Sequence, residues 1–111
     1  MSRQLITEVA GVLDAPVERV WPEIVRAIPR TELGEHVLAY QGGWWYRGEW
    51  SVTPVPEGTR LVHRVYNVGG NYWLVALANR LFIGFRERTR QSFAEGLAQI
   101  GNRLGCATRL A

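Results

Sequence analysis

The chain has 111 residues, of which 47% are hydrophobic and 21% charged, and its formal net charge is +3. This length supports a single domain, residues 1–111, that buries roughly two thirds of its unfolded surface without metals or disulfides. All thirteen basic residues are arginines, and they are spread along the chain with no run of five or six. The charge pattern therefore does not predict a nucleic-acid partner.

The start of the chain and its one cysteine bear on the cellular compartment. Residues 1–15 carry Glu8 and alternate in polarity, unlike the apolar stretch of a signal peptide. Cys106 has no second cysteine to pair with, which fits a reducing environment. We therefore expect a cytoplasmic protein without stable membrane insertion.

The first third of the chain predicts a strand and then a helix. Residues 3–13 alternate as a strand does. In residues 17–28 the apolar side chains recur every three or four positions, which is typical of an amphipathic helix. Asp14 is the predicted N-cap, Pro29 ends the helix, and Pro22 removes one backbone hydrogen bond within it.

The rest of the chain predicts a short sheet followed by a long helix. Residues 36–41, 44–53 and 60–68 form strands, so that the sheet has about four. A helix capped by Asn71 runs to about Gly105. Its first fourteen residues are apolar nearly all round, too few to span a bilayer. Its second half has an apolar stripe through Phe82, Phe85, Thr89, Phe93, Gly96, Leu97, Ile100 and Leu104.

A tight turn at residues 55–58 sets the register of the last two strands, with Trp50 opposite His63. Side chains alternate along a strand. One face therefore carries Trp44, Tyr46, Trp50, Val52, Leu61, His63, Val65 and Asn67, and the other carries Trp45, Arg47, Glu49, Ser51, Val62, Arg64 and Tyr66. The first face is the more apolar and is predicted to meet the C-terminal helix. On the second, Glu49 and Arg64 form a charge pair.

The apolar face and the helix together predict a pocket. Helical phase places Arg86 and Asn79 beside the buried stripe near Thr89. The candidate ligand-binding residues are Trp44, Trp50, Val65, Asn67, Asn79, Phe82, Thr89 and Phe93, and the candidate catalytic residues are His63, Arg86 and Tyr46. Each has an alternative: His63 also fits a hydrogen-bonded core histidine, Arg86 a solvent-exposed or ion-paired arginine, and the aromatic residues a plain core.

Three strings resemble the START-like, or SRPBCC, superfamily of polyketide cyclases and lipid-transfer proteins: LDAPVERVWPEIV, WSVTPVPEGTRLVHRVY and RERTRQSFAEGLAQIGNRLG. The resemblance implies an α+β helix-grip fold, in which an antiparallel sheet packs on a long C-terminal helix and one N-terminal helix follows the first strand. The superfamily has no shared catalytic residue to carry over. Between Pro29 and Trp44 there is room for one short strand where full-length members have several, which implies an abbreviated grip completed by a dimer partner.

The resemblance implies that a hydrophobic, aromatic or polyketide-like small molecule binds between the sheet and the C-terminal helix. A catalytic form would have cyclase or dehydratase chemistry, with His63 as general acid or base and Arg86 and Tyr46 polarising a carbonyl or holding an enolate. One alternative is a non-catalytic domain that forms a homodimer or docks a partner through the apolar segment that begins at Tyr72 and ends at Phe85. Another is lipid transfer at a membrane surface.

Metal and cofactor motifs are missing from the sequence. Neither His36 nor His63 has a carboxylate or second histidine at ligand spacing, and the glycines form no phosphate-binding motif. The sequence therefore predicts no metal and no cofactor.

Overall fold

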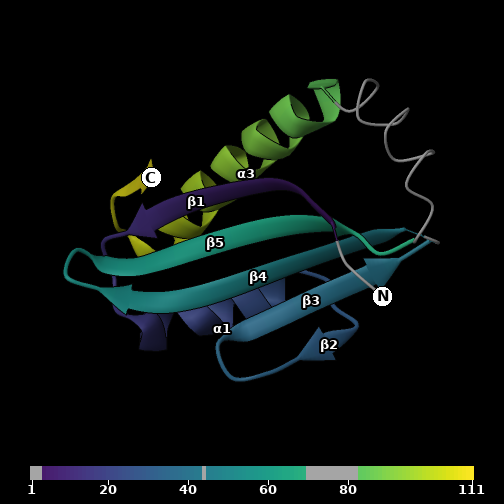
Figure 1. Ribbon diagram of the computed structural model, residues 1–111. Coiled ribbons are helices and arrows are strands. Elements are labelled where there is room, and N and C mark those ends of the chain that lie inside the picture. The colour runs from purple at the N-terminus through teal and green to yellow at the C-terminus, as the bar shows by residue number, and fades with distance from the viewer. Residues whose placement is uncertain (1–3, 44, 70–82) are drawn as a thin grey trace.

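The computed structural model describes residues 4–43, 45–69 and 83–111. Over these residues six strands form one antiparallel sheet in the order β2-β3-β4-β5-β1-β6 (Figure 1). The strands are β1 (Gln4–Leu13), β2 (Glu32–Leu33), β3 (Val37–Gly42), β4 (Tyr46–Val55), β5 (Gly58–Asn67) and β6 (Thr108–Leu110). With the helices α1 (Val17–Ala27) and α3 (Ile83–Leu104), the fold is α+β, as predicted. The predicted number of about four strands was wrong.

Both helices pack on the same face of the sheet and enclose the core with it. The buried core residues are Leu13, Ala15, Val17, Val20, Ile24, Leu38, Val52, Leu61, Phe93, Leu97 and Ile100. Those from α1 and α3 recur every three or four positions, as the amphipathic pattern predicted. Arg19 joins the helices by donating a hydrogen bond of 2.9 Å to the carbonyl of Leu104, at the end of α3 where the helix dipole favours a cation.

The helix α1 lies close to its predicted bounds, but its N-cap differs. Pro16 holds the N-cap position, and no side chain caps the helix. The prediction of Asp14 as the cap was wrong, because the helix begins at Val17 and Asp14 lies two residues before the N-cap position. The backbone N–H of Asp14 instead donates to the carbonyl of Ala107 at 2.9 Å. The helix ends at Ala27, since a residue that precedes a proline, here Pro29, is disfavoured in helical geometry.

The pairing of β4 with β5 has the predicted register. The pairs include Tyr46 with Asn67, Gly48 with Val65, Trp50 with His63, and Val52 with Leu61. At the loop, Gly58 has a φ of 134°, and a Cβ there would clash with the carbonyl of Leu13. The next residue, Thr59, is fully buried and donates a hydrogen bond of 2.7 Å to the carbonyl of Ala15. These contacts fix the hairpin against the junction of β1 and α1.

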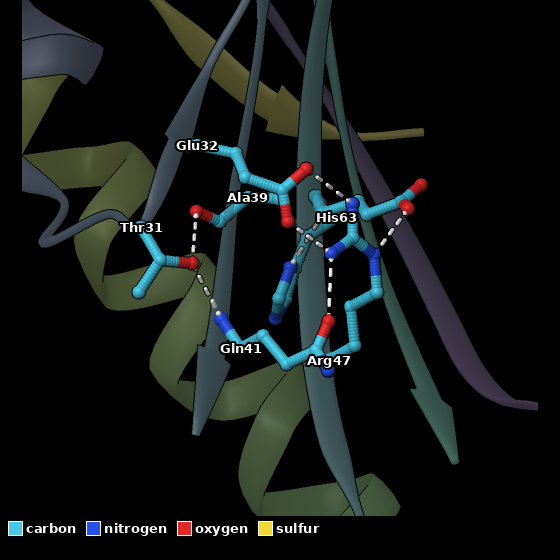
Figure 2. Close-up of polar contacts among 7 residues, drawn as sticks. Thr31, Glu32, Ala39, Gln41, Arg47 and His63 are labelled. Carbon is cyan, nitrogen blue, oxygen red and sulfur yellow. Dashed lines mark hydrogen bonds and ion pairs between the residues drawn. The ribbon is translucent and has the colours of Figure 1, made fainter. Parts of the chain in front are cut away.

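The face of the sheet away from the helices carries ion pairs. Figure 2 shows those that Arg47 makes. The guanidinium of Arg47 on β4 bonds the carboxylate of Glu32 on β2 at 3.2 Å and that of Glu49 at 2.9 Å, and the Glu32 bond contributes most to the raised pKa of Arg47. Glu49 lies opposite Arg64 as predicted. Arg64 bonds Glu8 on β1 at 2.6 Å. These pairs link four strands across the outer face.

The strands β2 and β6 are absent from the sequence prediction. The way into β6 is a helix-ending turn: Gly105 has a φ of 67°, its N–H donates to Asn102, and the N–H of Cys106 donates to Gly101. This pair of bonds is the Schellman arrangement, which favours glycine at the left-handed position. It reverses the chain, so that β6 pairs with β1 at the edge of the sheet.

The long C-terminal helix is confirmed over residues 83–104, where α3 runs. Its predicted part at 71–82 lies outside the described residues, as does most of the apolar segment that begins at Tyr72. In α3 the predicted stripe holds, because Phe93, Leu97 and Ile100 are buried and Thr89 is half-buried.

Candidate functional site

A cavity of about 1170 Å³, open to solvent, lies between the helix-facing side of β4 and β5, the end of α1, and α3. Its aromatic lining is formed by Tyr46, Trp50, His63, Phe85 and Phe93. Three of the α3 residues that line the cavity have small side chains or none, which leaves space beside the helix: Thr89, Ser92 and Gly96. A Cβ built on Gly96 would meet no heavy atom within 4 Å, so this part of the helix faces open space.

His63 is the buried polar group of this cavity, with 7% of its surface exposed. Its ring stacks on the indole of Trp50, with centroids 4.2 Å apart and an interplanar angle of 11°. The ring of Phe93 on α3 is nearly parallel to it at 6.4 Å. The cross-strand register produces the stack, because Trp50 and His63 are directly opposed on adjacent strands.

One ring nitrogen of His63 is fixed by the backbone. Nδ1 lies 3.2 Å from the carbonyl of Glu49 (Figure 2), and because a carbonyl only accepts, Nδ1 carries the proton. Burial lowers the pKa of His63 more than the Glu49 bond raises it, so the neutral ring is favoured. Neutral imidazole then has a lone pair on Nε2. His63 lines the cavity, and among the described residues no hydrogen bond engages its Nε2.

Tyr46 also lines this cavity. Burial raises the pKa of Tyr46, with a smaller contribution from Tyr40, so its hydroxyl keeps its proton. Trp45 packs edge-on against Tyr46, with centroids 5.6 Å apart, and against Phe85 of α3 at 6.1 Å. This cluster holds the sheet and the helix together beside the cavity.

Three arginines line the cavity, Arg26 from α1 and Arg88 and Arg103 from α3. Glu23 pairs with Arg26 at 2.7 Å and with Arg103 at 3.6 Å, and the Arg26 hydrogen bond lowers the pKa of the Glu23 carboxyl. Arg88 donates from Nε to the carbonyl of Gly84 at 3.3 Å. No ion pair joins Arg88 to a carboxylate within the described ranges.

The structure brings part of the predicted site together. Five predicted residues line the cavity: Tyr46, Trp50, His63, Thr89 and Phe93. Val65 is fully buried away from it, and Asn67 accepts a hydrogen bond of 2.8 Å from Gly69 N in the loop after β5. Arg86 is exposed and does not line it. Trp44, Asn79 and Phe82 lie outside the described residues.

The sequence prediction missed the polar residues of the cavity that lie beside the apolar stripe of α3. They are Arg88, Ser92, Gln99 and Arg103. Their spacings of four, seven and four residues place them along one edge of the helix, so the periodicity contained the signal. The sequence does not show that α1 approaches this edge and brings Arg26 to it.

Comparison with known proteins identifies no family for the chain: no family model, curated protein or solved structure matches it. None of the described helices is long and apolar enough to cross a membrane. Within the described ranges no three His, Cys, Asp or Glu side chains are grouped as metal ligands would be.

Proposed function

We propose that the protein binds a hydrophobic small molecule, aromatic or polyketide-like, between its sheet and α3, as START-like helix-grip proteins do. The observation that carries the proposal is the cavity of about 1170 Å³. Small-molecule sites enclose roughly 300 to 1,000 Å³ and combine an apolar lining with a few polar groups. The order of strand, helix, antiparallel strands and long C-terminal helix further supports a helix grip.

The chemistry of the lining favours a flat ligand. Trp50 and the parallel ring of Phe93 offer aromatic faces on which another ring can stack. His63 Nε2 accepts a hydrogen bond and the Tyr46 hydroxyl donates one. A ligand with a planar apolar body and one or two oxygen groups satisfies all of these positions.

Substitution at Gly96 tests the proposal, because its side chain would project into the cavity without a clash. We expect Gly96→Leu to weaken the binding of naphthylmethanol, a neutral aromatic probe, by at least about tenfold in isothermal titration calorimetry. Gly84→Leu is the matched control: a Cβ at Gly84 also meets open space, but Gly84 does not line the cavity. Absence of binding to the wild-type protein, or equal losses in both variants, would contradict the proposal.

A second proposal, cyclase-like or dehydratase-like proton transfer, has support from His63 and Tyr46. A neutral histidine with an unprotonated Nε2 acts as a base toward a carbon acid, and a protonated tyrosine hydroxyl stabilises the enolate that forms. The probe is acetonaphthone in heavy water, with deuterium uptake into its methyl group followed by proton NMR. We expect the wild-type protein to accelerate uptake and His63→Gln to lose at least about a hundredfold of that acceleration. An unchanged rate in His63→Gln would exclude His63 as the base.

A further inference from the structure

The described charged side chains that line the cavity are all positive. Its described lining includes Arg26, Arg88 and Arg103 and no carboxylate. Glu23, which bonds Arg26 and Arg103 beside the cavity, supplies one negative charge to this group. Three cations and one anion leave an excess of two positive charges around a cavity whose other described lining residues are uncharged.

Arg88 is the cation that is best prepared for a ligand. Its Nε is held by the carbonyl of Gly84, whereas its two terminal nitrogens make no hydrogen bond or ion pair with the residues that the structure describes. Ser92 follows four residues later on the same side of α3, and the adjacent Thr89 also lines the cavity. A guanidinium with two hydroxyls nearby is a suitable set of donors for a carboxylate.

The interior of the cavity, unlike its arginine-lined edge, favours an uncharged group. His63 is neutral, stacked on Trp50 and near Phe93, and it offers a lone pair rather than a charge. A carboxylate placed there would lose its hydration without gaining a cation. The acid group of a bound ligand therefore belongs at the arginine edge of α3, and the apolar body belongs inward against the aromatic wall.

We propose that the ligand is an amphipathic organic acid, with a planar apolar body against Trp50 and Phe93 and a carboxylate bound by Arg88 at the opening of the cavity. This inference rests on the proposed binding function, since it names the chemical class that the same cavity selects. The two remaining arginines add long-range attraction for an anion. Arg88 supplies the direct contact.

The test compares two probes that differ in charge, naphthoate and naphthylmethanol, by isothermal titration calorimetry. We expect wild-type protein to bind naphthoate about tenfold more tightly, a difference typical of one charge-assisted contact at a partly exposed site. Arg88→Gln should remove this preference, because it weakens the binding of naphthoate much more than the binding of naphthylmethanol, and Arg88→Lys should retain part of it. Arg86→Gln is the matched control, because Arg86 is an exposed arginine of the same helix that does not line the cavity.

The possible outcomes separate the two proposals. Equal binding of both probes to the wild-type protein, or equal effects of Arg86→Gln and Arg88→Gln, would overturn the organic-acid class and leave the binding function standing. Failure of both probes to bind would overturn both. Circular dichroism of each variant checks that the fold is intact.

Discussion

At the scale of single residues, His63 has two different environments. Its Nδ1 bonds the backbone of β4, and its side chain also lines the cavity, with no hydrogen bond to Nε2 from the described residues. The sequence left two alternatives for this side chain, a core histidine bonded to a backbone carbonyl and a pocket residue. Both descriptions apply to it. One ring nitrogen holds the imidazole in place, and the other is left for a ligand.

The lowered pKa of His63 predicts a pH dependence of stability. Below the ordinary pKa of 6.5 the unfolded chain takes up a proton at this position that the folded protein resists, so the free energy of unfolding decreases as the pH falls. The slope from this group cannot exceed about 1.4 kcal/mol per pH unit, the value for one proton, and it develops as the pH falls through 6.5. We expect His63→Gln to lose this part of the slope, measured by urea unfolding from about pH 7.5 to about pH 5.5.

His36→Asn provides the control, since it removes the other histidine and leaves His63 in place. That variant should keep the part of the slope that His63 produces. A slope in His63→Gln equal to that of the wild-type protein would show that His63 is protonated equally in the folded and unfolded chains.

Strand residues of the site were easier to predict than helix residues. Alternation and a two-residue loop determine which strand side chains share a face. Tyr46, Trp50 and His63 were therefore placed correctly on the same face. On a helix, each residue is rotated by about 100° from the one before it, so Arg86 and Arg88 point to different sides. The helical phase favoured Arg86, whereas in the structure Arg88 lines the cavity and Arg86 does not.

At the scale of elements, the length of a strand determined whether it could be predicted from the sequence. The strands β1, β4 and β5 have ten residues each, enough for alternation to be visible, whereas β2 has two and β6 three. Long-range bonds hold the short strands in place: Arg47 reaches Glu32 on β2, and the N–H of Ala111 after β6 donates to Ala10 on β1. Contacts of this kind have no local signature in a single sequence.

The helix α3 serves both the core and the cavity, because its inward side changes in character along its length. Leu97 and Ile100 fill the core near its C-terminal end. Thr89, Ser92 and Gly96 are too small to fill the space between the helix and the sheet. An amphipathic stripe predicts that a helix face is inward, but it does not show whether that face is packed or open, since that depends on the opposing elements.

At the scale of the whole molecule, the net charge of +3 is unevenly distributed. Arginines on the outer face of the sheet, Arg47 and Arg64, are matched by Glu32, Glu49 and Glu8. The arginines of the cavity outnumber their acidic partner. The positive charge is thus concentrated around the cavity and not spread evenly over the surface. This distribution supports a role for the cavity arginines in recognising a charged ligand.

An unfilled cavity in a small domain lowers stability, because its lining lacks the contacts that a packed core has. We therefore expect ligand binding to stabilise the wild-type protein. A probe at about one hundred times its Kd contributes roughly 2.7 kcal/mol, which corresponds to a rise in Tm of roughly 10 °C for a domain of this size. Differential scanning calorimetry with and without naphthoate measures this rise.

Gly96→Leu separates stability from binding in the same experiment. Leucine gains up to about 1 kcal/mol over glycine in a helix, and at Gly96 it also fills open space, so the ligand-free Tm should increase while the ligand-induced rise becomes about half as large or smaller. Gly84→Leu gains the helical contribution alone and should keep the full ligand-induced rise. A ligand-free Tm lower in Gly96→Leu than in Gly84→Leu would mean that the space beside Gly96 is occupied. Proteins often keep a binding site open at a cost in stability. That result would show that this protein does not do so beside Gly96.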